Sequence, residues 1–258
     1  MHLSEKAVLL FEIELMFYHL GRYIILIGST LSKPEKLSMY WKETARQMND
    51  IGVGSLLIVA LVSVFIGAVT AVQFAYQLEG SSIPPYYIGY IVRDIMIIEL
   101  APTFTCLALA GKVGSNMAAE LGGMRQKEQI DALEVMGVDT SAYLILPKLL
   151  AALVVIPMLV VMSAFTGMAG GYMACVFGKL VTVTEFMQGL RSFFEPYNIF
   201  MMQVKSIVFA FILTSISCYQ GYYVKGGSIE LGKASTAAVV LSNIMILLAD
   251  YIIALMLT

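Results

Sequence analysis

Long stretches without any charged residue dominate this sequence. Five of them are free of Asp, Glu, Lys and Arg: Ile51–Leu78, Leu100–Gly111, Leu149–Gly178, Ser206–Val224 and Ala234–Ala249. A helix needs about 20 mostly apolar residues to cross a bilayer. The second stretch reaches that length only when it is extended back to Tyr86, which places Arg93, Asp94 and Glu99 inside it. The pattern therefore predicts five transmembrane helices, the second unusually polar, at about 51–78, 86–115, 141–177, 199–224 and 234–257.

Composition agrees with an all-α integral membrane protein. Hydrophobic residues make up 59% of the 258 residues and charged residues 13%, whereas soluble domains average roughly 45–50% and about 25%. The mean hydropathy is +0.82. We expect one transmembrane domain over residues 49–258, preceded by a separate N-terminal helical region over residues 1–48.

The N-terminal region has the pattern of an amphipathic helix. Apolar residues recur every three or four positions from Leu9 to Leu31, and Glu12, His19 and Arg22 lie on the opposite flank. This pattern is typical of a helix lying in the membrane interface, and it would also suit a sixth helix packed on the spans. A cleaved signal peptide is not expected, because acidic residues interrupt the apolar core that such a peptide needs.

The basic residues are distributed unevenly between the predicted loops. Placing the N-terminus in the cytoplasm and the C-terminus in the periplasm puts twelve of the sixteen on the cytoplasmic side, as the positive-inside rule favours: Lys6, Arg22, Lys33, Lys36, Lys42, Arg46, Lys112, Arg125, Lys127, Lys148, Lys225 and Lys233. The segment Ala110–Val138 then faces the cytoplasm, between the second and third spans.

Sequence motifs for catalysis, metal binding and nucleic acid binding are absent. HExxH, GxSxG and GxxxxGK[ST] do not occur, Cys106, Cys175 and Cys218 stand alone, and no basic stripe suggests nucleic acid. We therefore expect no catalytic residue and no metal site, and a nucleotide would have to be bound by another chain.

The segment Ala110–Val138 is charged and has a helical pattern. From Met124 onward, Ile130, Leu133 and Met136 fall on one side of the predicted helix. Gly122-Gly123 before it and Gly137 after it are expected to break the chain there. Such a helix could dock into a groove on a soluble partner or lie on the membrane surface, and the pattern is compatible with both.

The same segment carries the most specific similarity in the chain. The runs that carry it are Glu99-Leu100-Ala101-Pro102, Ala110-Gly111-Lys112-Val113-Gly114-Ser115, Ala119-Glu120-Leu121-Gly122, Met124-Arg125, Glu128-Gln129-Ile130 and Met136-Gly137-Val138-Asp139. Together with Lys205-Ser206, Gly232-Lys233-Ala234-Ser235-Thr236 and Asp250-Tyr251, they resemble the MlaE family of ABC transporter permeases. The similarity covers nearly the whole chain. One departure is Ile98, where family members often have Arg.

The resemblance implies a phospholipid permease in the inner membrane of a Gram-negative-type bacterium, contributing to outer-membrane lipid asymmetry. Its expected partners are a second copy of the chain, a cytoplasmic ABC ATPase that binds ATP and Mg²⁺, and a periplasmic MCE-domain protein. An accessory cytoplasmic subunit is a further partner that the resemblance allows. Residues 116–138 would be the coupling segment. By analogy, the residues that meet the ATPase are Glu120, Arg125, Glu128, Asp131 and Leu133.

Ionisable residues inside the predicted spans are a second set of candidates, because intramembrane charges are costly and usually face a cavity or one another. The candidates for a polar or lipid-binding cavity are Arg93, Glu99, Pro102, Lys205 and Asp250. Glu99 could pair with Lys205, and Arg93 with Asp250, or they could contact a lipid headgroup. Pro102 is expected to kink the second span beside Glu99.

Two other functions remain open from the sequence. One is an ABC permease for another hydrophobic cargo, such as a sterol or a different lipid. The other is a non-transporting membrane scaffold that recruits soluble proteins through residues 124–136. A GxxxG pattern at Gly167 and Gly171 in the third span predicts close helix packing, which we expect to be internal to the chain rather than between two copies.

Overall fold

The computed structural model describes residues 17–30, 37–80 and 82–257, and within these ranges the chain is helical, with no strand. Five helices are long and apolar enough to cross a membrane, which confirms the predicted all-α membrane fold: Tyr40–Leu78, Tyr87–Gln126, Thr140–Phe177, Pro196–Tyr222 and Ser228–Leu257.

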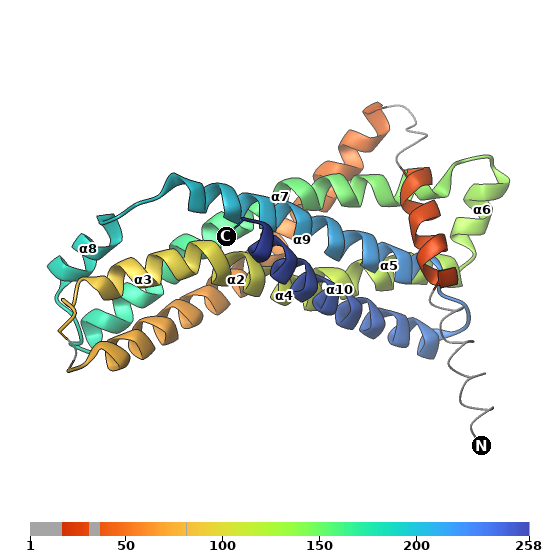
Figure 1. The fold of residues 1–258 in the computed structure, drawn as a ribbon. Helices are drawn as coiled ribbons and strands as arrows, with labels where there is room; N and C mark the ends of the chain where they lie inside the picture. The colour runs from red at the N-terminus through yellow and green to blue at the C-terminus, as the bar shows by residue number, and fades with distance from the viewer. Residues whose placement is uncertain (1–16, 31–36, 81, 258) are drawn as a thin grey trace, which may run out of the picture.

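The helices form an elongated bundle (Figure 1). Its longest members are α2 (Leu37–Leu78) and α7 (Thr140–Phe177), with α9 (Pro196–Tyr222) and α10 (Ser228–Leu257) beside them. Short helices mark the two ends: α6 (Gln129–Val135) at one and α8 (Val183–Arg191) at the other. We refer to these as the α6 end and the α8 end.

The second span is one continuous rod with two π-helical turns. It consists of α3 (Tyr87–Ile95), η1 (Met96–Leu100), α4 (Ala101–Leu109), η2 (Ala110–Gly114) and α5 (Ser115–Gln126). Pro102 has no N–H to offer the carbonyl four residues earlier, and the N–H of Ala101 donates to Met96, five residues back. A π turn of this kind widens the helix locally and is frequent at functional sites. Here it carries Glu99.

The end of this span differs from the sequence prediction. The helix does not stop near residue 115 but continues to Gln126, so residues 116–126 of the predicted coupling segment belong to the rod. Gly122 does not break it, because the glycine serves close packing: a Cβ there would lie 2.4 Å from Leu231 Cδ1. The chain turns instead at Glu128, which has a positive φ of 56°.

Helices α2 and α7 pack closely because glycines face one another. A Cβ on Gly67 would lie 1.9 Å from the carbonyl oxygen of Gly167, and one on Gly170 would lie 2.1 Å from that of Val64. Small residues allow helix backbones to approach in membranes. The glycine pattern of the third span is therefore internal packing, as expected.

The N-terminal region is described only in part, and residues 1–16 and 31–36 of the predicted amphipathic helix lie outside the described ranges. The helix over residues 17–30 packs on α9, where His19 shares a hydrogen bond with Tyr219 (2.7 Å) and Tyr23 donates one to Ser215 (2.7 Å). Helix α2 begins at Leu37 and runs without interruption. The predicted boundary at residue 48 therefore falls inside a helix.

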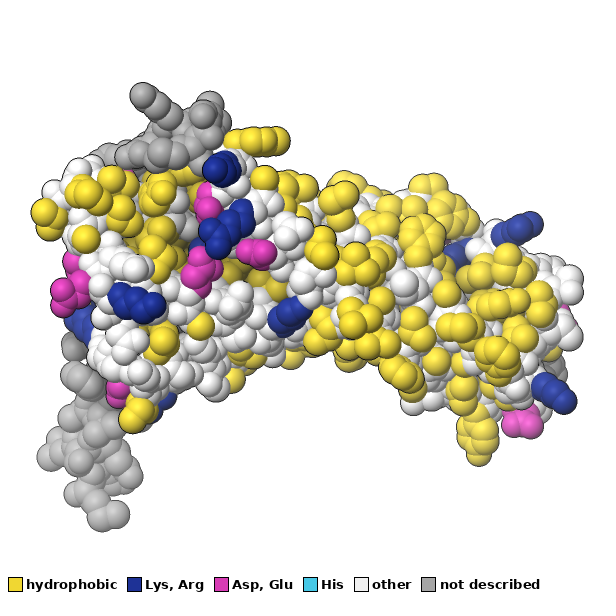
Figure 2. Space-filling model, turned by 180° about the vertical axis from the view of Figure 1, so that it is seen from behind, with side chains coloured by type: hydrophobic (Ala, Val, Ile, Leu, Met, Phe, Trp, Pro, Cys, Tyr) yellow, Lys and Arg dark blue, Asp and Glu magenta, His cyan; other side chains and the backbone are white. Residues whose placement is uncertain are grey.

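The surface matches a membrane-spanning body. Figure 2 shows charged side chains gathered at the two ends, more of them at the α6 end, and a mainly hydrophobic surface between them. Apolar side chains on that surface are stable in contact with lipid, where they need no protein cover.

Candidate functional site

A cluster of three ionisable residues ties three spans together inside the bundle. Lys205 of α9 is fully buried, and its Nζ lies 2.6 Å from Glu99 Oε2 of η1 and 2.7 Å from Asp250 Oδ1 of α10. Thr103 adds a hydrogen bond of 2.9 Å to the other oxygen of Asp250. The structure thus confirms the pairing of Glu99 with Lys205 that the sequence left open.

The three members of this cluster differ in exposure. The side chain of Asp250 is 8% exposed, whereas that of Glu99 is 47% exposed. An intramembrane carboxylate in contact with hydrocarbon is costly, and such residues usually face a cavity or another charge. Glu99 therefore presents a polar group outward at a depth where the neighbouring surface of the chain is apolar.

Arg93 is not part of this cluster, and the proposed pairing with Asp250 is wrong. Its guanidinium forms an ion pair with Asp94 (2.7 Å) and donates to the carbonyl oxygens of Leu190, Ser192 and Phe193. These carbonyls belong to the last turn of α8 and the two residues that follow it, where backbone carbonyls lack partners within the helix. Arg93 is 3% exposed; it connects α8 to α3 and also lines the apolar cavity described next.

An apolar cavity of about 510 Å³ lies between α3, η1, α7, α8 and α9, toward the α8 end. Its lining is almost entirely hydrophobic and includes Ile97, Phe165, Met168, Tyr172 and Phe194. A cavity of this size is within the range of small-molecule sites. Its lining is suited to acyl chains and offers little to a polar ligand.

Helix α6 lies at the end of the bundle and is held there by polar contacts. Arg125 of α5 forms an ion pair with Asp131 (2.7 Å) and lies 3.7 Å from Glu134. Glu134 also accepts hydrogen bonds from Thr140 at the start of α7 and from Tyr222 at the end of α9, each 3.2 Å long. α6 is thus connected to the ends of three spans.

The exposed apolar residues of α6 and of its C-terminal cap only partly match those predicted from the helical pattern. Ile130 is fully buried in a cluster with Leu121 and Ile145, and Leu133 is half-buried. Met136, which the pattern placed on the apolar side, is 68% exposed, and Val135, which it did not, is 90% exposed. The periodicity of one short helix could not identify Val135, because the position of the turn at Glu128 decides which face meets the bundle.

The five residues expected to meet the ATPase therefore divide into two groups. Glu128 is exposed and Leu133 is half-buried, whereas Arg125 and Asp131 are partly exposed but bound to each other. Glu120 lies inside the rod, where it pairs with Lys148 of α7 (2.5 Å). Glu134, Lys148 and Thr103 were not among the sequence candidates. The position of Lys148 directly before the uncharged run Leu149–Gly178 was the one available signal.

Comparisons with known proteins find permeases that are similar to nearly the whole chain. The MlaE family, described as "Permease MlaE", matches residues 44–256. A probable ABC transporter permease protein of Rickettsia bellii is 35% identical over 91% of this chain and 90% of the relative. The intermembrane phospholipid transport system permease protein MlaE of Haemophilus influenzae is 31% identical over 92% and 91%.

A plant relative is similar to the same part of the chain. The chloroplastic protein TRIGALACTOSYLDIACYLGLYCEROL 1 of Arabidopsis thaliana is 32% identical over 89% of this chain and 65% of its own length. The family match includes nearly all residues of the five spans. This five-span membrane protein, with its buried Lys205 cluster, belongs to the MlaE family of permeases.

Proposed function

We propose that this protein is the transmembrane subunit of an ATP-driven ABC transporter of the bacterial inner membrane that moves phospholipids. The observation that carries the proposal is the half-exposed Glu99, held by the buried Lys205 in the middle of the membrane-spanning body. Phospholipids combine a charged headgroup with acyl chains. The cluster and the apolar cavity nearby offer one surface for each.

A second copy of the chain would complete this site. Helix α10, which carries Asp250, is the least buried of the five spans, and Glu99 emerges beside it. In a single chain Glu99 would face hydrocarbon, whereas a second copy packed across α10 would enclose it in a polar cavity. We therefore propose a homodimer with the two Glu99 clusters facing a shared cavity.

The ATPase would dock at the α6 end. The exposed Val135 and Met136 supply apolar contact area, and Glu128 supplies a charge beside them. With the ATPase at the α6 end, the N-terminus would lie in the cytoplasm and the C-terminus toward the periplasm. The α8 end would also face the periplasm and would contact an MCE-domain partner. ATP and Mg²⁺ would be bound by the ATPase, and delivery to the MCE protein would serve outer-membrane lipid asymmetry.

Docking can be tested with Val135→Asp. The new charge would be buried in the proposed contact with the ATPase, and the substitution should disturb the chain itself little, because Val135 is 90% exposed. We expect the ATPase to be lost from the purified complex, while Leu180→Asp, an exposed apolar residue at the α8 end, leaves it bound. If Val135→Asp retains the ATPase in full, the docking surface is elsewhere. Glu128→Arg provides a second variant of the same surface.

The transport function can be tested with the tagged protein purified from its native membrane in mild detergent. Mass spectrometry should identify an ABC ATPase, an MCE-domain protein and bound phospholipid. In proteoliposomes, Glu99→Gln should reduce ATP-dependent phospholipid transfer by about tenfold, the equivalent of one lost charged hydrogen bond. Glu79→Gln, outside the cluster, is the matched control. Recovery of sterol would indicate another cargo, and a chain without partners would support the scaffold function.

A further inference from the structure

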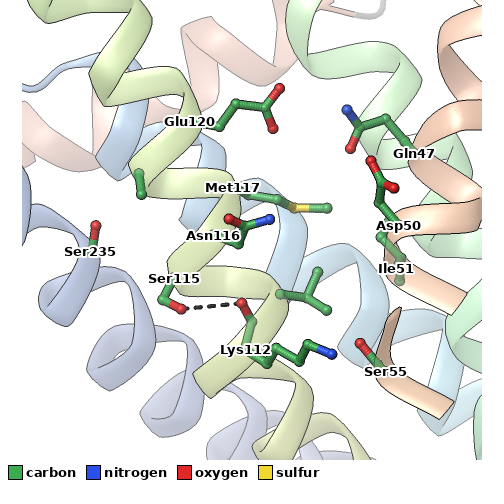
Figure 3. Close-up of a pocket in the computed structure, with 12 residues that line it drawn as sticks. Gln47, Asp50, Ile51, Ser55, Lys112, Ser115, Asn116, Met117, Glu120 and Ser235 are labelled. Atoms are coloured by element: carbon green, nitrogen blue, oxygen red, sulfur yellow. Dashed lines mark hydrogen bonds between the residues drawn. The ribbon is translucent and has the colours of Figure 1, made fainter. Parts of the chain in front are cut away.

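A second polar pocket lies far from the Glu99 cluster, between α2, α5 and α10 toward the α6 end. It has a volume of about 550 Å³ and shares no lining residue with the cluster. Figure 3 shows Gln47 and Asp50 of α2 on one side, with Lys112, Asn116 and Glu120 of the second span on the other.

The pocket lies at the level where the membrane surface is expected. Asp50 immediately precedes the uncharged run Ile51–Leu78, Lys112 immediately follows Leu100–Gly111, and Ser235 is the second residue of Ala234–Ala249. Each of the three lining elements thus changes from polar to apolar at the pocket. Hydrocarbon ends and headgroups begin at such boundaries.

The pocket contains one cation and one anion that are not neutralised within the described part of the chain. Glu120 is paired with Lys148. Lys112 donates a hydrogen bond to the carbonyl oxygen of Gly54, and among the described residues neither it nor Asp50 forms an ion pair. Charges at a membrane boundary attract complementary groups of a ligand. This pocket is therefore matched to a ligand with one charge of each sign.

Ser55 is an independent indication of a ligand. It is 0% exposed, it lines the pocket, and its hydroxyl has no hydrogen-bond partner among the described residues. Buried hydroxyl groups in folded proteins nearly always have a partner, because an unpaired one costs free energy. Ser55 and Lys112 both line the pocket (Figure 3), and Lys112 donates to the carbonyl oxygen of Gly54, the residue before Ser55.

We propose that this pocket binds the headgroup of a zwitterionic phospholipid from the leaflet at the α6 end. The phosphate would accept hydrogen bonds from Lys112 and Ser55, and the ammonium group would face Asp50. An anionic headgroup would satisfy Lys112 but leave Asp50 opposed to a like charge. The inference rests on the proposed phospholipid transport and adds a headgroup site in that leaflet, separate from the Glu99 cluster.

The test is a photo-cross-link from within the pocket. Ser235 is replaced by a photoreactive amino acid in the full complex, reconstituted in vesicles with equal amounts of phosphatidylethanolamine and phosphatidylglycerol. Mass spectrometry should show adducts mainly with phosphatidylethanolamine. Lys112→Gln and Asp50→Asn should each lower the adduct yield by about tenfold, and Lys127→Gln, an exposed Lys outside the pocket, should leave it unchanged.

Ser55→Ala separates binding from folding. It removes a hydroxyl that has no partner within the described chain, so the variant should fold normally and still lose adduct severalfold. Three outcomes would overturn the proposal: equal adduct yields with both lipids, an adduct yield that Lys112→Gln does not change, or a cross-link to a second copy or to the ATPase. Phospholipid transfer is measured on the same vesicles. Transfer without an adduct would refute the pocket alone, and an adduct without transfer would refute the proposed function alone.

Discussion

Substitution of Lys205 by Met tests the energetic role of the buried cluster. The change removes the ammonium group that lies 2.6 Å from Glu99 and 2.7 Å from Asp250 but keeps an apolar side chain of similar length. Removing one partner of a buried ion pair costs about 3–5 kcal/mol, because the other charge is left uncompensated. Glu99 is half-exposed and Asp250 keeps its hydrogen bond from Thr103, so we expect the lower end of this range, about 3 kcal/mol.

This loss can be measured by thermal unfolding of the purified protein in detergent. About 3 kcal/mol corresponds to a decrease in Tm of about 6–12 °C for a chain of this size, at roughly 2–4 °C per kcal/mol. The double variant Lys205→Met with Asp250→Asn should recover at least about half of the decrease, since it removes the uncompensated charge. Lys233→Met, at a largely exposed Lys, is the control.

The outcome that refutes this reasoning is specific. If Lys205→Met unfolds at the same temperature as the original protein, or if adding Asp250→Asn lowers the Tm further, the cluster does not act as a buried charge pair.

Three further predictions follow from particular contacts. Gly170→Ala should lower the free energy of unfolding by about 1–3 kcal/mol, because the added methyl group would meet the backbone of α2. Gly232→Ala, where the space around the Cα is open, should have no destabilising effect. Chemical unfolding of both variants checks this. Hydrogen bonds from the hydroxyl and the backbone N–H of Thr182 lower the pKa of Glu185 below its usual value. Protonation of Glu185 therefore weakens this cap. The cap stabilises α8 fully above the unfolded-state pKa of Glu185, and this stabilisation is lost as the pH falls through the lowered folded-state pKa. Hydrogen exchange of α8, corrected for intrinsic rates, should show this loss in the original protein and not in Glu185→Gln. Glu134→Ala should leave the ATPase bound and hydrolysing ATP but lower phospholipid transfer by about tenfold, because α6 loses its hydrogen bonds to α7 and α9; unchanged transfer would show that these bonds do not transmit movement.

The spans were predictable because each contains an uncharged run, although the second had to be extended across Arg93, Asp94 and Glu99 to reach the length of a bilayer crossing. The pairing of Glu99 with Lys205 was one of the sequence alternatives. The partner of Arg93 was not predictable. Besides the adjacent Asp94, it binds three backbone carbonyls in the last turn of α8 and just after it. No side-chain pattern in the sequence identifies a carbonyl that lacks a donor. The geometry of α8 had to be known first.

The turn at Glu128 was not predictable for a different reason. Gly122-Gly123 is the stronger local signal for a break, yet Gly122 is needed where α5 meets α9 and α10, and the positive φ falls on a non-glycine residue. Tertiary packing therefore overrode the local preference. This shift of the turn changed the exposed apolar surface at α6: Ile130 is buried, whereas Val135 is exposed together with the predicted Met136.

The position of the turn also bears on how movement of α6 could reach the Glu99 cluster. Because α5 ends where α6 begins, Arg125 at the end of the rod can bind both Asp131 and Glu134. Glu134 in turn accepts a hydrogen bond from Tyr222, the last residue of α9, and Lys205 lies on the same helix about 25 Å away at 1.5 Å per residue. The second span carries Glu99 and α9 carries Lys205, so both partners of the central ion pair lie on rods whose ends are attached to α6. A small displacement of α6 would therefore act on both sides of that pair.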